Sequence, residues 1–117
     1  MAGPRVIFSH KWISEQGVNG TSNAVTVPDG HTYVVKQLTF YANPTAETIR
    51  GYFRDVDRGP ALFSCAAPVT LDAGAQPAWF GFYGALVFGS GQTFQWEIHA
   101  GLGDGADVYA GGYDLVG

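Results

Sequence analysis

Charged residues are scarce in this chain of 117 residues: they make up 14% of it, against roughly 25% in an ordinary soluble domain. The six Lys and Arg residues all lie at or before Arg58, and the formal net charge is −4. Nucleic-acid binding depends on clustered basic residues that neutralise phosphates, so we expect no nucleic-acid partner. A surface with so few charges is typical of a protein that other chains partly cover.

Cysteine and long apolar runs are also missing. Cys65 is the only cysteine, so no intramolecular disulfide can form and packing alone must hold the fold. Its apolar neighbours predict a small buried side chain. No run approaches the ~18 apolar residues of a membrane span, and residues 1–5 do not lead into the apolar core of a signal peptide. We therefore expect a protein made in the cytoplasm of its host cell, with no membrane partner.

No apolar pattern with a helical period is long enough to predict a helix. Short runs rich in β-branched and aromatic residues alternate instead with turn residues, including 17 Gly and 6 Pro. The sequence predicts one domain, residues 1–117, with a short N-terminal arm at 1–5. Its fold class is all-β, an antiparallel β-sandwich of jelly-roll or Greek-key type with almost no helix.

The clearest local signal lies between Val25 and Asn43. A β-branched strand stops at Pro28, turns through Asp29-Gly30 and is followed by a long strand, which predicts an antiparallel hairpin. In the long strand two faces compete for the core, namely Val34, Lys36, Leu38 and Phe40 against Tyr33, Val35, Gln37, Thr39 and Tyr41. Two explanations stay open: Lys36 reaches solvent from an edge, or a bulge near Lys36-Gln37 shifts the alternation.

Further strands are expected over residues 5–14, 48–56, 61–66, part of 68–77, 78–84, 86–88, 92–99 and 107–115. In the first, Val6, Phe8 and Trp12 should share one face and Ile7 and Ile13 the other, with a polar loop over 15–22. In the strand over 48–56, Ile49, Gly51 and Phe53 should share one side. In the strand over 92–99, we expect a buried row of Phe94, Trp96 and Ile98, with Gln95 and Glu97 outside or at an interface.

The residues that carry catalytic or metal-binding chemistry do not form a convincing set. His10, His31 and His99 fall on separate strands or turns, with no Cys or carboxylate at ligand spacing. We therefore expect surface histidines, no metal, no cofactor and no catalytic residue. No Ser or Cys lies in the strand-to-helix elbow of a hydrolase, so a non-enzymatic protein is expected.

Two acidic segments have simpler interpretations than metal binding. Asp55 and Asp57 are two apart at a strand end and should point the same way, but the neighbouring Arg54 and Arg58 favour a solvated, salt-linked end. The loop Gly101–Asp107 has a faint likeness to the calcium loops of β-roll repeats. It occurs once, without the repeat that builds such sites, so a hairpin loop is favoured.

The run Trp79-Phe80-Gly81-Phe82-Tyr83 is apolar on both sides of a strand. Trp79 and Tyr83 should share one side and Phe80 and Phe82 the other. One side fills the core, and the other meets a loop of the same chain, a sugar or a neighbouring protein. The low charge content favours a protein interface.

A longer pattern suggests a family. The chain resembles small structural proteins of tailed bacteriophages in an apolar strand after Gly89-x-Gly91, in the ending Gly112-Tyr113-Asp114-Leu115, and in Val25-x-Val27-Pro28-x-Gly30-x-x-Tyr33-Val34-Val35-Lys36-x-Leu38-x-Phe40-x-x-Asn43. The resemblance covers residues 23–117 and carries no catalytic residue. Such proteins are β-sandwich modules that serve as head-decoration (minor capsid) proteins or as domains of tail and fibre proteins.

The resemblance implies a non-enzymatic virion protein, first of all a capsid decoration protein that binds the major capsid protein or another virion protein. It also implies a homo-oligomer, with a trimer favoured. The alternative is a carbohydrate- or receptor-binding module of a tail or fibre. Six residues are the expected interface: Met1, Ala2, Gly3 and Pro4, an arm with nothing in it to fold alone, together with Trp79 and Tyr83. Packing of the arm on its own sandwich stays open.

Overall fold

A computed structural model describes residues 6–42, 49–56, 69–71, 78–100 and 105–117, with the backbone alone for residues 6, 69–71 and 78–83. No α-helix occurs in these segments. The strands are β1 Val6–Val18, β2 Gly20–Thr21, β3 Val25–Thr26, β4 His31–Ala42, β5 Ile49–Asp55, β6 Val69–Leu71, β7 Ala78–Phe88, β8 Thr93–His99 and β9 Ala106–Val116.

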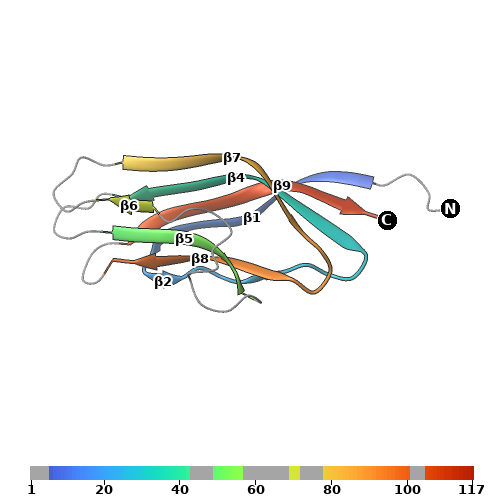
Figure 1. The fold of residues 1–117 in the computed structure, drawn as a ribbon, viewed down its shortest axis with the longest axis horizontal. Coiled ribbons are helices and arrows are strands. Elements are labelled where there is room, and N and C mark those ends of the chain that lie inside the picture. The colour runs from blue at the N-terminus through green and yellow to red at the C-terminus, as the bar shows by residue number, and fades with distance from the viewer. Residues whose placement is uncertain (1–5, 43–48, 57–68, 72–77, 101–104) are drawn as a thin grey trace.

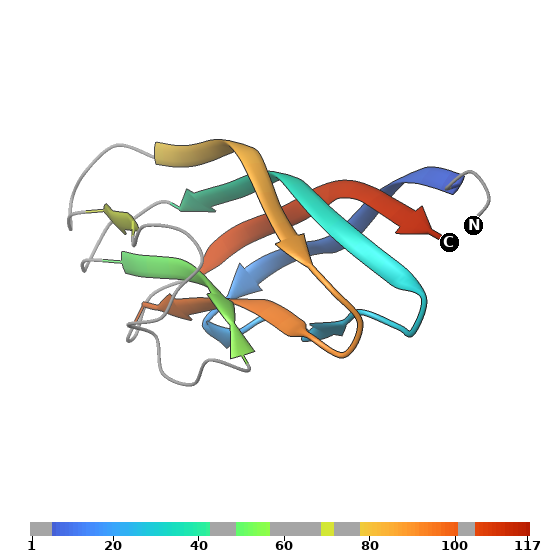
Figure 2. The same cartoon turned by 45° about the vertical axis from the view of Figure 1, so that its right-hand side comes forward.

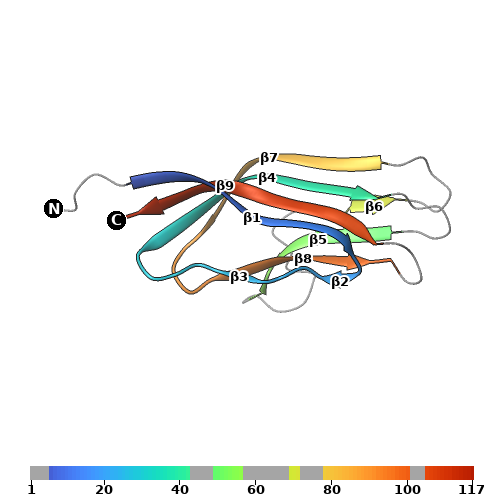
Figure 3. The ribbon, with the colours of Figure 1, turned by 180° about the vertical axis from the view of Figure 1, so that it is seen from behind.

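The strands form two antiparallel sheets that face each other (Figures 1 and 3). The first sheet has the order β1-β9-β4-β7, and the second has the order β2-β8-β5-β6, with β3 also paired to β8. Since β2 and β3 share one position beside β8, the chain builds two four-position sheets and changes sheet at most of its turns. This alternation is a jelly roll, so the expected all-β sandwich is confirmed.

The turn at Pro28–Gly30 is present, but the predicted hairpin around it is wrong. Gly30 has a φ of 79° and His31 N–H donates to the Pro28 carbonyl over 3.2 Å, as in a tight turn. However, β3 pairs with β8 in the second sheet, whereas β4 pairs with β7 and β9 in the first. Val27 is buried between the two strands, where the chain crosses from the second sheet to the first. The turn residues therefore predicted the bend correctly but not the partners of the strands on either side of it.

The alternation in β4 is shifted by a bulge, which confirms the second of the two explanations. The register of β4 shifts between Val35 and Gln37 against both neighbouring strands. Val35 is fully buried before the shift and Leu38 and Phe40 are fully buried after it, while Lys36 is exposed. The extra residue lets both halves of one long strand face the core.

β1 also contains bulges, and these overturn the predicted faces of that strand. Its register against β9 shifts between Lys11 and Ile13, so both Trp12 and Ile13 pack on the core. Ile7 and Phe8 remain 63% and 51% exposed. The strand continues to Val18, through a second shift, so the polar loop expected over 15–22 begins later than predicted.

The core confirms the expected phase of β5 and β8. Ile49, Gly51 and Phe53 are buried on one side of β5, as are Phe94, Trp96 and Ile98 on one side of β8. The largest fully buried side chains come from both sheets: Trp96, Phe40, Phe53, Phe94, Ile13, Leu38, Ile49, Ile98, Val27 and Val35. β6 occupies part of 68–77, and β7 is one strand where two were expected.

Several expectations lie outside the described residues: the N-terminal arm, the strand over 61–66 with Cys65, and most of the loop at 101–106. The start of β1 lies beside the end of β9, where Val6 pairs with Val116 at one end of the first sheet (Figure 2). Within the segments that are described, no helix has the length and apolar character of a membrane span.

Candidate functional site

The most distinctive surface feature is where two bulges meet a pair of glycines on the outer face of the first sheet. β9 lies between β1 and β4 and carries Gly111-Gly112. Lys11 pairs with Gly111, and the bulge of β1 comes directly after it. In β4, Val35 pairs with Gly112 and Gln37 pairs with Gly111, so the bulged residue between them is Lys36. Bulges re-aim side chains, so two of them beside one glycine pair make a local feature of the sheet.

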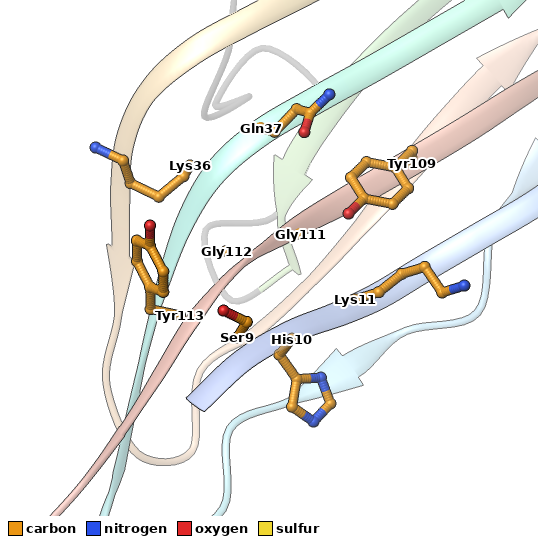
Figure 4. Close-up of a pocket in the computed structure, with 9 residues that line it drawn as sticks. All are labelled: Ser9, His10, Lys11, Lys36, Gln37, Tyr109, Gly111, Gly112 and Tyr113. Atoms are coloured by element: carbon orange, nitrogen blue, oxygen red, sulfur yellow. The ribbon is translucent and has the colours of Figure 1, made fainter. Parts of the chain in front are cut away.

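The glycine pair forms the floor of a hollow of about 440 Å3 (Figure 4). Tyr109 and Tyr113, four residues apart on β9, stand on either side of the floor, and Lys36 and Lys11 leave from strands on opposite sides of β9. The described residues that line the hollow are Ser9, His10, Lys11, Lys36, Gln37, Tyr109, Gly111, Gly112 and Tyr113.

Side chains on the floor would close the hollow or distort the sheet. A Cβ atom at Gly111 would contact the hydroxyl end of the Tyr109 ring, and a Cβ atom at Gly112 would collide with the backbone carbonyl of Val34. The first contact can be relieved by movement of one ring, but the second involves backbone. Glycine is therefore required at 112 by the close approach of the Val34 backbone, whereas a side chain at 111 needs only the Tyr109 ring to move.

The charge at the hollow contrasts with the charge of the chain. Lys11 and Lys36 are the only lysines in a sequence with a net charge of −4, and both line it. Among its described lining residues none is acidic. Hydroxyl and amide groups from Ser9, Gln37 and Tyr113 complete its polar part. The hollow therefore offers hydrogen-bond donors and positive charge.

The same face continues past Tyr109 into a second, smaller hollow of about 190 Å3. Tyr109 lines both hollows, and Tyr41 and Asp107 line the second. Tyr41 and Tyr113 are 42% and 44% exposed. The Asp107 carboxylate accepts a hydrogen bond of 3.0 Å from Gly17 N–H, which ties β9 to the end of β1. Three tyrosines therefore follow the outer face of the first sheet.

The expected interface residues meet this face in part. In the β4–β7 register, Trp79 is opposite Tyr41 and Tyr83 is opposite Gln37. Opposite residues of an antiparallel pair belong to the same face of a sheet, so both positions continue the tyrosine-bearing face. Met1, Ala2, Gly3 and Pro4 lie outside the described residues.

A separate polar network covers the outer face of β5 and β8 in the second sheet. Arg54 Nη1 donates to Glu97 Oε1 over 2.8 Å, and His99 Nε2 lies 2.8 Å from Glu97 Oε2 and 2.7 Å from the Tyr52 hydroxyl. Burial alone raises the pKa of Glu97, but hydrogen bonds from His99, Arg54 and Tyr52 outweigh it and lower the pKa below its usual value. Burial, and then Glu97, raise the pKa of Tyr52.

A second histidine–carboxylate pair closes one end of the sandwich. His31 Nδ1 lies 2.8 and 3.0 Å from the two carboxylate oxygens of Asp114, which is 6% exposed. Tyr33 lies beside this pair, and burial, followed by the charge of Asp114, raises the pKa of its hydroxyl. Trp12 stacks on Tyr33 with ring centroids 4.6 Å apart. The pair therefore links the first residue of β4 to the end of β9.

These contacts correct two sequence expectations. His31 and His99 do have carboxylate neighbours, one from 83 residues away and one two residues back on the same strand. Asp55 is 5% exposed, not solvated, because the alternation of β5 turns it inward with Phe53 and turns Arg54 outward to Glu97. Asp57 and Arg58 lie outside the described residues. Within the described chain, no three His, Cys, Asp or Glu side chains gather as metal ligands would.

A scan against protein-family models and a search of curated proteins find no match to this chain. The site is therefore defined by geometry alone. Sequence reasoning did not identify Lys11, Tyr109 or the Gly111-Gly112 floor as parts of a site. Two signals were available: adjacent glycines inside a strand, which indicate a close approach, and the phase conflict at Lys36.

Proposed function

We propose that this chain is a non-enzymatic structural protein of a bacteriophage virion, which binds a protein lattice through the outer face of β1-β9-β4-β7. In the simplest form it is a decoration protein on the major capsid shell. The observation that carries the proposal is the line of Tyr41, Tyr109 and Tyr113 along that face, continued in register by Trp79 and Tyr83.

Tyrosine and tryptophan are enriched at the buried centres of protein interfaces, where they supply contact area at a low entropic cost. Jelly rolls occur both in viral capsid proteins and in lectins, and that likeness is one of architecture, which supports a binding role and names no partner.

A carbohydrate-binding module of a tail or fibre is the second candidate. The hollow between Tyr109 and Tyr113 favours it, since about 440 Å3 lies within the usual size of small-molecule sites, about 300–1,000 Å3. Binding of the isolated protein to a glycan array, abolished by Tyr113→Ala, would favour this candidate over lattice binding.

Two measurements test the proposal: the number of copies of this chain per particle, and the fraction of sites on particles that variants of it occupy. Quantitative mass spectrometry of purified particles should find hundreds of copies for a head protein, whereas a handful would place the chain in the tail and absence would refute the virion role. In a rebinding assay, Tyr41→Ala/Tyr113→Ala should lower occupancy on particles. The matched control is Arg50→Ala/Gln95→Ala on the outer face of the second sheet, which should bind as the wild type does.

A further inference from the structure

The hollow has a charge pattern that the proposed function does not explain by itself. An interface built from tyrosines needs no lysine, yet both lysines of this acidic chain lie beside one pair of glycines. They come from different strands, β1 and β4, and each stands at a bulge that interrupts a regular ladder. Such an arrangement places the two lysines of the chain on either side of one hollow.

We propose that the hollow seats the carboxylate side chain of a glutamate or aspartate on an acidic segment of the lattice protein; this inference rests on the proposed function. Lys11 and Lys36 border the hollow on two sides, with their ammonium groups turned outward in opposite directions, and a bound carboxylate would draw these long side chains inward (Figure 4). Ser9 and Tyr113 supply hydroxyl donors at the rim. The end of the Tyr109 ring lies over Gly111, so its hydroxyl adds a donor beside the glycine floor. The absence of acidic residues from its described lining makes the hollow complementary to an anion.

The expected affinity of one such seat is low. Exposed ion pairs contribute little, because both side chains lose freedom and salt screens the charges. Each lysine should therefore change binding by up to about fivefold. On a lattice the tyrosines supply the contact area, and the carboxylate fixes the register and the choice of partner.

The test uses the folded protein and a short acidic peptide. A blocked hexapeptide of alternating Glu and Gly is titrated into isotope-labelled protein at low salt, and the amide signals of Gly111 and Gly112 are followed by NMR. We expect the chemical shifts of both amides to change on addition of the Glu peptide and to remain unchanged on addition of a peptide with Gln in place of Glu. Lys11→Gln and Lys36→Gln should each weaken the shifts by up to about fivefold, and the double variant should remove them.

Arg50→Gln is the matched control, because it removes the same charge from the second sheet, where Arg50 is exposed. An equal loss of binding in this variant would show that net charge alone attracts the peptide and would overturn the site. Equal shifts with the Gln peptide would also overturn it. Tighter binding of glucuronate than of the peptide, at the same two amides, would assign the hollow to an acidic sugar instead.

The failure of this inference is distinguishable from the failure of the proposed function. If Lys11→Gln/Lys36→Gln binds particles at wild-type occupancy and selectivity, the lattice role stands and the carboxylate seat is wrong. If the wild-type protein is absent from particles but still binds the Glu peptide at the hollow, the seat stands and the lattice role is wrong.

Discussion

Trp96→Ala should be among the most destabilising substitutions in the chain, because Trp96 joins the two sheets. Its side chain is 1% exposed and packs against Phe53 and Phe40, with ring centroids 5.6 and 6.0 Å away. Its indole N–H donates to the carbonyl of Tyr109 on β9 over 3.1 Å. The residue therefore supports from inside the strand that carries Tyr109 and Tyr113 outside.

The expected loss is about 3–5 kcal/mol, the range for truncating a large buried aromatic side chain. Trp96→Phe keeps a ring between Phe40 and Phe53 and loses the N–H donor and part of the volume, so it should cost about 1–3 kcal/mol. Phe8→Ala is the surface control: Phe8 is 51% exposed, and its loss should stay within about 0.5 kcal/mol.

Urea unfolding, followed by circular dichroism, gives the free energy of unfolding of each of the three variants. The m-value should stay the same in all of them, which shows that the surface exposed on unfolding has not changed. A loss below about 1 kcal/mol for Trp96→Ala, or a loss as large for Phe8→Ala, would refute the assignment of the inner face.

Four more substitutions test local features of the same fold. Gly112→Ala should cost about 1–3 kcal/mol, because its Cβ atom meets backbone, whereas Gly111→Ala meets only a ring and should cost less; equal losses in urea would contradict this. Ser22→Ala should cost about 1–3 kcal/mol in the same assay, because the buried hydroxyl accepts the Trp96 backbone N–H over 2.9 Å; an unchanged midpoint would show that another group replaces it. Glu97 has a lowered pKa, so its carboxylate stabilises the fold above the unfolded pKa of about 4.3 and this contribution is lost as pH falls through the folded pKa. Glu97→Gln should therefore flatten the fall in stability of the wild type below about pH 4.3, and identical acid-unfolding curves would contradict the network.

Period-two alternation was a reliable guide where one strand faces the core without interruption. The buried rows of β5 and β8 follow directly from it. In β4 the alternation revealed a conflict, since no single phase buries both Val35 and Leu38, and left a bulge as one of two explanations, which the register shows to be the right one. The alternation in β1 failed as a guide because an extra residue turns Trp12 and Ile13 the same way. A bulge is visible in a sequence only when both competing faces are strongly apolar, as they are in β4.

The partners of strands and side chains were less accessible to sequence reasoning. The turn at Pro28–Gly30 looks the same whether the chain stays in its sheet or crosses to the other, so β3 was paired wrongly. The hollow depends on three strands meeting in register, with Lys11 a hundred residues before Gly111. Local patterns contain no record of such distant neighbours.

Lysine acetylation is the most direct test of the claim that the outer face of β1-β9-β4-β7 is the binding surface. Because Lys11 and Lys36 are the only lysines and both lie on this face, their modification reports its exposure without interference from other lysines. We predict that both are acetylated in the free protein and protected in purified particles, while Arg50 on the other sheet stays equally accessible to an arginine reagent. Equal acetylation in the two states, with Arg50 protected on particles, would contradict the account.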